Sequence, residues 1–111
     1  MHRLIPGTAR TCFGETAPEF VRYSEEVLFG DVWRREELSL RDRSLITVSA
    51  LVAAGQTGQL PYHLRLARDN GLSEEELAEA ITHLAFYAGW PRAASALEVA
   101  RTVFPKPASD E

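Results

Sequence analysis

The segment from Leu45 to Ala54 is apolar on nearly every side, and Gly55 follows it directly. A helix without a polar face must be surrounded by other protein, so this segment belongs in the middle of a domain or at a subunit contact. Ser39 and Asp42 form a pattern typical of a helix start, in which a hydroxyl accepts from the backbone N–H groups of the first turn. We therefore predict a central helix that begins after Ser39 and ends at Gly55.

Four further helices are predicted from start and stop signals on either side of this one. Proline is tolerated in a first helical turn, Ser73 with Glu76 forms a capping box, and glycine or asparagine supplies a stop. Between these signals the apolar residues recur at helical spacing. The predicted helices cover residues 18–29, 60–69, 73–88 and 90–104, with stops at Gly30, Asn70-Gly71, Gly89 and Pro105.

The chain has room for a single hydrophobic core, because it contains only 111 residues. No stretch shows the alternation of apolar and polar residues that a β-strand requires, so the predicted fold class is all-α. We expect an N-terminal arm over residues 1–16, one helical domain over residues 17–104 and a polar tail over residues 105–111.

Composition excludes several kinds of partner. The net charge of −4 and the pI near 5.4 argue against nucleic acid, whose phosphates need clustered lysine and arginine. No apolar run is long enough for export or for a membrane span, so we expect a cytoplasmic protein with no membrane partner. Cys12 is the single cysteine, and three scattered histidines complete no metal-binding spacing. A glycine-rich phosphate cradle is also missing. We therefore expect neither a metal nor a cofactor.

His63 lies on the apolar side of its predicted helix. Leu60, His63, Leu64 and Ala67 follow one another at helical spacing, whereas the charged side chains occupy the other side. His63 therefore faces the interior. It is either a core histidine that is satisfied by a hydrogen bond, or a general acid or base whose pKa is tuned by burial.

His83 has Glu79 one turn before it and Tyr87 one turn after it. A carboxylate at this spacing can orient the imidazole while the phenol closes one side of a binding site. The alternative is a solvated surface pair of small energetic value. The nearby aromatic residues Phe86, Tyr87 and Trp90 are either packing residues or part of a ligand platform.

Arg41 and Arg43 occupy the first turn of the central helix, where a positive charge opposes the helix dipole. One interpretation is ordinary pairing with Asp42 or Glu37. The other is that an arginine anchors a substrate carboxylate through two parallel hydrogen bonds.

Five blocks between Glu19 and Phe104 resemble the carboxymuconolactone decarboxylase family. The resemblance implies the alkylhydroperoxidase-like helical bundle of about five to six helices. It also implies assembly as a homo-oligomer, a trimer or hexamer, with sites near subunit contacts. The blocks, in order, are Phe29-Gly30-Asp31-Val32-Trp33, Arg43-Ser44-Leu45-Ile46-Thr47, His63-Leu64-Arg65, Asn70-Gly71 and His83-Leu84-Ala85-Phe86-Tyr87.

The peroxidase branch of this superfamily carries a glutamate, a Cys-x-x-Cys pair and a histidine. Aligned through His63, this chain has Ser44 at the glutamate position and Gln56 and Gln59 at the cysteine positions. A peroxide-reducing relay needs a nucleophilic and a resolving thiol, so that chemistry is lost at this site. A peroxiredoxin-like activity would have to use Cys12 across a subunit contact.

The decarboxylase branch needs no thiol, and resemblance to it implies a cofactor-independent lyase that acts on a small organic acid in aromatic-compound catabolism. Such a reaction needs a cation, an electrophile and an acid. The implied roles are Arg43 as the carboxylate anchor, His63 as the acid and His83 as a second acid or orienting group. The remaining candidates for substrate binding are Arg41, Ser44, Tyr87 and Trp90. Arg41 takes the place of Arg43 as the anchor if the helical phase relative to Ser44 decides which arginine faces the substrate. A small-anion binding protein without turnover is the other alternative.

Overall fold

The computed structural model describes residues 13–106, and within this range every regular element is helical. The predicted all-α fold is therefore confirmed. Cys12 and the expected tail beyond residue 106 lie outside the described residues. The elements are α2 (Pro18–Arg22), the π-helical η1 (Tyr23–Leu28), the 3-10 turn η2 (Val32–Arg34), α3 (Leu40–Ala54), α4 (Leu60–Asp69), α5 (Glu74–Ala88) and α6 (Trp90–Val103).

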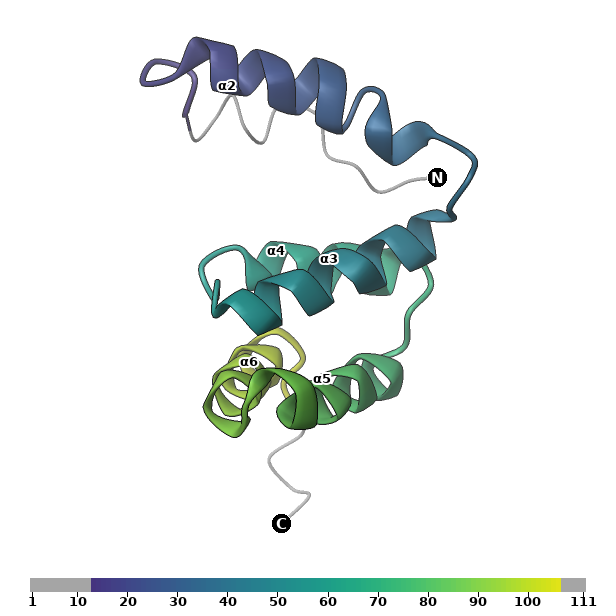
Figure 1. Ribbon diagram of the computed structural model, residues 1–111, viewed down its shortest axis with the longest axis vertical. Coiled ribbons are helices and arrows are strands. Elements are labelled where there is room, and N and C mark those ends of the chain that lie inside the picture. Colours follow the sequence, from purple (N-terminus) through teal and green to yellow (C-terminus); the bar gives the residue numbers. More distant parts are fainter. Residues whose placement is uncertain (1–12, 107–111) are drawn as a thin grey trace.

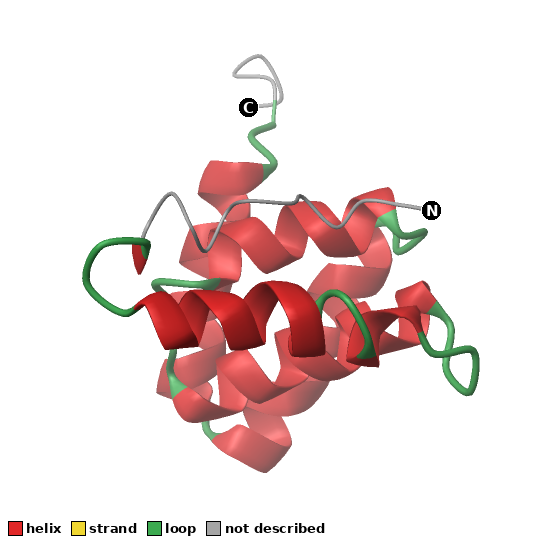
Figure 2. Ribbon diagram, turned by 90° about the horizontal axis from the view of Figure 1, so that it is seen from above, coloured by secondary structure: helices red, strands yellow, loops and turns green. Residues whose placement is uncertain are grey.

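The helices are arranged in three tiers. The α3–α4 pair forms the middle tier, α5 and α6 cover one side of it, and α2, η1 and η2 lie on the other side (Figure 1). Viewed from above, the α2–η1 segment crosses in front of the remaining helices (Figure 2). Helix α3 packs against α4, α5, α6 and η2, which confirms that the almost wholly apolar helix is the central one.

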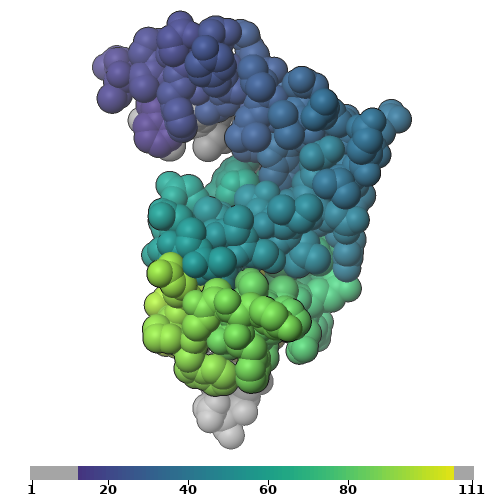
Figure 3. All heavy atoms as spheres, in the orientation of Figure 1, coloured from purple at the N-terminus to yellow at the C-terminus, as the bar shows by residue number. Residues whose placement is uncertain are grey.

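The α2–η1 segment stands away from the four-helix body formed by α3–α6. A notch separates α2 from the middle tier at one end, and the segment around η2 closes the other end (Figure 3). Phe20, Tyr23 and Val27 are all exposed on this segment. A helix was predicted here, but its π geometry was not: the Phe29 N–H donates to the Ser24 carbonyl five residues earlier, at 2.9 Å.

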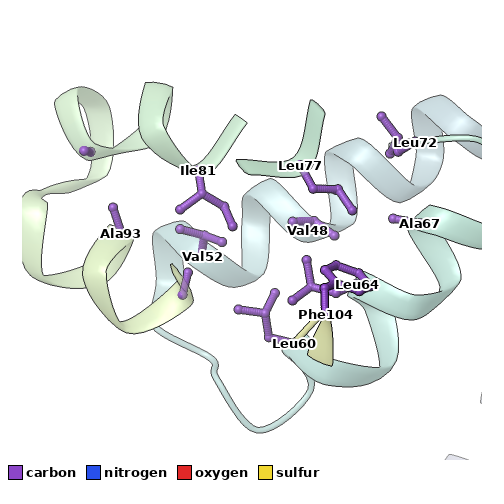
Figure 4. Close-up of a cluster of buried hydrophobic side chains, with 12 residues drawn as sticks. Val48, Val52, Leu60, Leu64, Ala67, Leu72, Leu77, Ile81, Ala93 and Phe104 are labelled. Carbon is purple, nitrogen blue, oxygen red and sulfur yellow. The ribbon is translucent and has the colours of Figure 1, made fainter. Parts of the chain in front are cut away.

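The hydrophobic core lies within the four-helix body (Figure 4). Val48, Leu60, Leu64 and Ile81 are completely buried and come from three different helices. Each such side chain contributes about 1.5–3 kcal/mol relative to an exposed one. This body is therefore the stable platform on which the flanking segment is carried. None of its helices, and no other helix among residues 13–106, has the length and hydropathy needed to cross a membrane.

The predicted helix ends are found with their expected hydrogen bonds. Ser39 Oγ accepts from the Asp42 N–H at 3.0 Å, and Ser73 with Glu76 forms the reciprocal capping box. Gly55 ends α3 with φ at +71°, a left-handed conformation that glycine adopts without strain. A Cβ at this position would also lie 2.9 Å from Arg92 Nη1.

Candidate active site

His63 projects from α4 toward η2 and lies between two aromatic rings. Its ring stacks on Trp33, with centroids 6.1 Å apart and planes inclined by 20°. The Tyr62 ring contacts the same imidazole edge to face, with ring centroids 5.0 Å apart. The ring is partly buried against Trp33 and does not belong to the hydrophobic core, in which Leu60, Leu64 and Ala67 of the same predicted stripe are fully buried.

Burial lowers the pKa of His63 from 6.5 to about 4, so the imidazole is neutral at pH 7. Its Nδ1 atom is buried and has no hydrogen-bond partner among residues 13–106. An unsatisfied buried polar atom costs free energy and needs an explanation. Among residues 13–106 the structure thus shows no hydrogen bond of the kind that the first interpretation of His63 requires at Nδ1.

Trp33 is the site residue that sequence reasoning missed. It is only 5% exposed although it lies on a three-residue turn. Besides His63 it packs near Phe29, with ring centroids 5.9 Å apart. The sequence offered two signals: Trp33 ends the first of the five family blocks, and it stands next to the strongly charged run Arg34-Arg35-Glu36-Glu37. Nothing local connected that ring with a histidine thirty positions later.

Arg43 reaches the same segment from α3. Its Nη2 donates to the backbone carbonyl of Arg35 at 3.2 Å, and its Nε is buried without a partner among the described residues. Residues 33–35 therefore contact both the imidazole of His63 and the guanidinium of Arg43. Both functional groups keep one buried nitrogen that makes no hydrogen bond within residues 13–106.

Pairing between α3 and α4 sets the distance between these two groups. Asn70 Nδ2 donates to Ser44 Oγ at 3.1 Å, so residues 44 and 70 lie at the same level. His63 comes seven residues before Asn70, which at 1.5 Å per residue places it about 10 Å farther along the helix pair. His63 and Arg43 therefore lie at different levels of the α3–α4 pair.

Arg41 is engaged elsewhere. Its guanidinium pairs with Glu76 at 3.0 Å and with Asp42 at 3.3 Å, which links α3 to the start of α5. The pKa of Glu76 is held below its usual value. The largest cause is the hydrogen bond that its carboxylate accepts from the Ser73 backbone N–H, and the hydrogen bond from Arg41 is the next largest. Of the two candidate arginines, Arg43 is therefore the one that contacts the residue after η2.

Ser44 is fully buried, and its hydroxyl accepts the hydrogen bond from Asn70. This contact ties α3 to α4. The structure gives Ser44 a positioning role and no access to a ligand.

His83 and its aromatic neighbours lie apart from this arrangement. His83 is exposed on α5 and stacks on Tyr87, with centroids 4.9 Å apart. Phe86, Tyr87 and Trp90 are 76%, 78% and 65% exposed. Because α5 and η2 lie on opposite sides of the α3–α4 pair (Figure 1), one chain does not bring His83, Tyr87 or Trp90 together with His63.

Fold and site together define a small all-helical protein whose candidate site combines a neutral imidazole with a guanidinium. The carboxymuconolactone decarboxylase family model matches residues 18–102. The chain therefore belongs to the carboxymuconolactone decarboxylase family.

Several curated proteins are similar to this chain. A 4-carboxymuconolactone decarboxylase of Acinetobacter baylyi is 37% identical over 86 residues, which cover 78% of this chain and 64% of the relative. A nitrosuccinic acid decarboxylase of Metarhizium robertsii is 34% identical over 87 residues, covering 75% of this chain and 61% of the relative. An uncharacterized 15.0 kDa protein of Paracoccus denitrificans is 33% identical over 81 residues, covering 71% and 60%. The chain thus spans about three fifths of the length of these relatives.

Proposed function

We propose that the protein is a cofactor-independent decarboxylase for a small organic acid with more than one carboxylate, of the 4-carboxymuconolactone type, in aromatic-compound catabolism. The names of two relatives support decarboxylation. The observation that carries the proposal is the pair of buried nitrogens, Arg43 Nε and His63 Nδ1, without partners among the described residues. Both groups contact the segment 33–35, so an anion between them would satisfy both.

In this mechanism Arg43 binds the carboxylate that the substrate keeps. The bond to the other carboxylate breaks, carbon dioxide leaves, and the electron pair passes into the unsaturated lactone carbonyl. One proton must then be delivered to carbon for each carbon dioxide released. The apolar walls that Trp33 and Tyr62 provide favour loss of the charged carboxylate, because the neutral product is easier to hold in such surroundings.

His63 supplies the proton only after substrate has bound. In the free protein the ring is neutral at pH 7, since burial has lowered its pKa to about 4. A carboxylate next to the ring raises that pKa, because an opposite charge favours the imidazolium. Binding therefore takes up a proton, which His63 then passes to the substrate.

We propose further that the protein is a homo-oligomer, a trimer or hexamer, in which His83, Tyr87 and Trp90 act from a neighbouring subunit if they act at all. The support is the exposure of Phe86, Tyr87 and Trp90: Tyr87 stacks on His83, and Phe86 contacts Trp90 edge to face. Exposed aromatic groups of this size mark interaction surfaces.

Carbon dioxide release from 4-carboxymuconolactone tests the function. The wild type should turn the substrate over, His63→Asn should lower kcat by about 100-fold or more, and Arg43→Gln should lower kcat/KM by about 10- to 100-fold. Arg65→Gln, on the exposed side of α4, is the matched control and should retain activity.

An inactive wild type would exclude this substrate, and saturable binding without release would select the anion-binding alternative. Loss of activity on Cys12→Ser would instead favour thiol chemistry.

A further inference from the structure

The Trp33 indole covers the side of His63 that faces away from the four-helix body. It stacks on the imidazole and is itself almost fully buried. The centroids of the two rings are 6.1 Å apart, which leaves no room for a planar ligand between the indole and the imidazole. A ligand that reaches His63 from this side must therefore move Trp33.

The segment that carries Trp33 is short. η2 contains three residues, and residue Arg35 after it is already extended. The segment packs against α3 and is tied to the body by the buried Trp33 ring and by the 3.2 Å hydrogen bond from Arg43 to the Arg35 carbonyl. A short segment outside the core helices opens at a lower free energy than those helices do.

Gly30 lies at the start of the segment that would have to move with Trp33. A Cβ at this position would lie 2.5 Å from the Glu25 carbonyl oxygen and 2.8 Å from that of Glu26. Only glycine therefore permits the tight approach of this turn to the end of η1. The preceding π-helical hydrogen bonds of η1 are a less common arrangement that frequently accompanies functional sites.

We propose that Trp33 controls access to the site: residues 30–35 pivot at Gly30 and lift the indole, which exposes His63 and frees the Arg43 guanidinium from the Arg35 carbonyl. The nature of the entering anion rests on the proposed function, but the movement itself does not. The size and shape of ligand that is accepted would then depend on the ring at position 33.

Carbethoxylation by diethyl pyrocarbonate measures the access directly, because the reagent attacks neutral imidazole and each modified histidine is located by peptide mass. N-acetylhistidine in the same solution serves as the reference for a fully accessible imidazole. His63 in the wild type should react on the order of tenfold more slowly than this reference. Trp33→Ala should remove most of that difference, and Gly30→Ala should make the difference smaller while leaving the indole in place. Leu97→Ala, which shortens a side chain on the outer side of α6, should leave the difference unchanged.

Amide hydrogen exchange of the wild type supplies a second measurement that does not depend on any variant folding. Residues 30–35 should exchange on the order of a hundredfold faster than the interior of α4. Equal exchange of the two segments would overturn the proposal, and so would a His63 reactivity that Trp33→Ala leaves unchanged.

Neither measurement requires a substrate, so failure of access control and failure of decarboxylation are separable. Shielding of His63 without carbon dioxide release would remove the proposed function and retain the role of Trp33. Decarboxylation with an unshielded His63 would do the reverse.

Discussion

Lowering the pH from 7 to 5 is expected to destabilise the folded protein by up to about 2 kcal/mol through His63 alone. The pKa of this imidazole is about 4 in the folded protein and 6.5 in the absence of burial. Between these values the unfolded chain binds a proton that the folded chain does not. Stability from this group is therefore present above pH 6.5 and is lost as the pH falls toward 4.

Urea unfolding of the wild type and of His63→Asn, at pH 7 and pH 5, measures the effect. Asparagine keeps a polar side chain of similar reach but cannot titrate, so the wild type should lose about 2 kcal/mol more than the variant. At a slope of about 2 kcal/mol per molar urea, the difference amounts to about 1 M in the midpoint. Protein concentration must be held fixed, because subunit association adds to apparent stability.

His83→Asn is the matched control, because it makes the same substitution at an exposed position of α5. Carboxylates contribute equally to all three proteins and cancel in the comparison. Identical pH dependence in the wild type and in His63→Asn would refute the reasoning, because it would mean that His63 is as well solvated in the folded chain as in the unfolded one.

Three further predictions concern the platform and are all checked by urea unfolding at pH 7. Leu64→Ala removes a fully buried side chain and should cost about 2–5 kcal/mol, whereas Leu97→Ala, on the outer side of α6, should cost well under half of that. Gly55→Ala should cost about 1–2 kcal/mol, because it combines a left-handed φ with a contact to Arg92, and unchanged stability would contradict that account. Ser73→Ala should cost about 1 kcal/mol by removing a capping box, and a neutral result would show that the cap is satisfied otherwise.

The helical framework was predictable because its signals are local. Ser39 caps α3 with the hydrogen bond that its spacing to Asp42 indicated, and Gly89 ends α5 where the stop was expected. The all-round apolar character of residues 45–54 also identified the central helix. The helix that carries His63 was predicted as well, but the contact of its ring with Trp33 was not.

The residues that were predicted to form one site lie in separate places in the structure. Arg41 and Arg43 lie two residues apart in one helical turn, and the sequence alone did not decide between them. Glu76, thirty-five residues later, takes Arg41, whereas the Arg35 carbonyl takes Arg43. His83 and His63 both looked available for catalysis, but α5, which carries His83, lies on the side of the α3–α4 pair away from the segment whose Trp33 stacks on His63 (Figure 1).

The sequence by itself thus determined the helices and their ends, because each depends on residues within one or two turns. The tertiary structure alone decided that Trp33 covers His63 and that Arg43, and not Arg41, contacts the segment that follows Trp33. Those contacts join elements far apart in the chain, and their geometry is set by how the tiers pack and not by any local pattern.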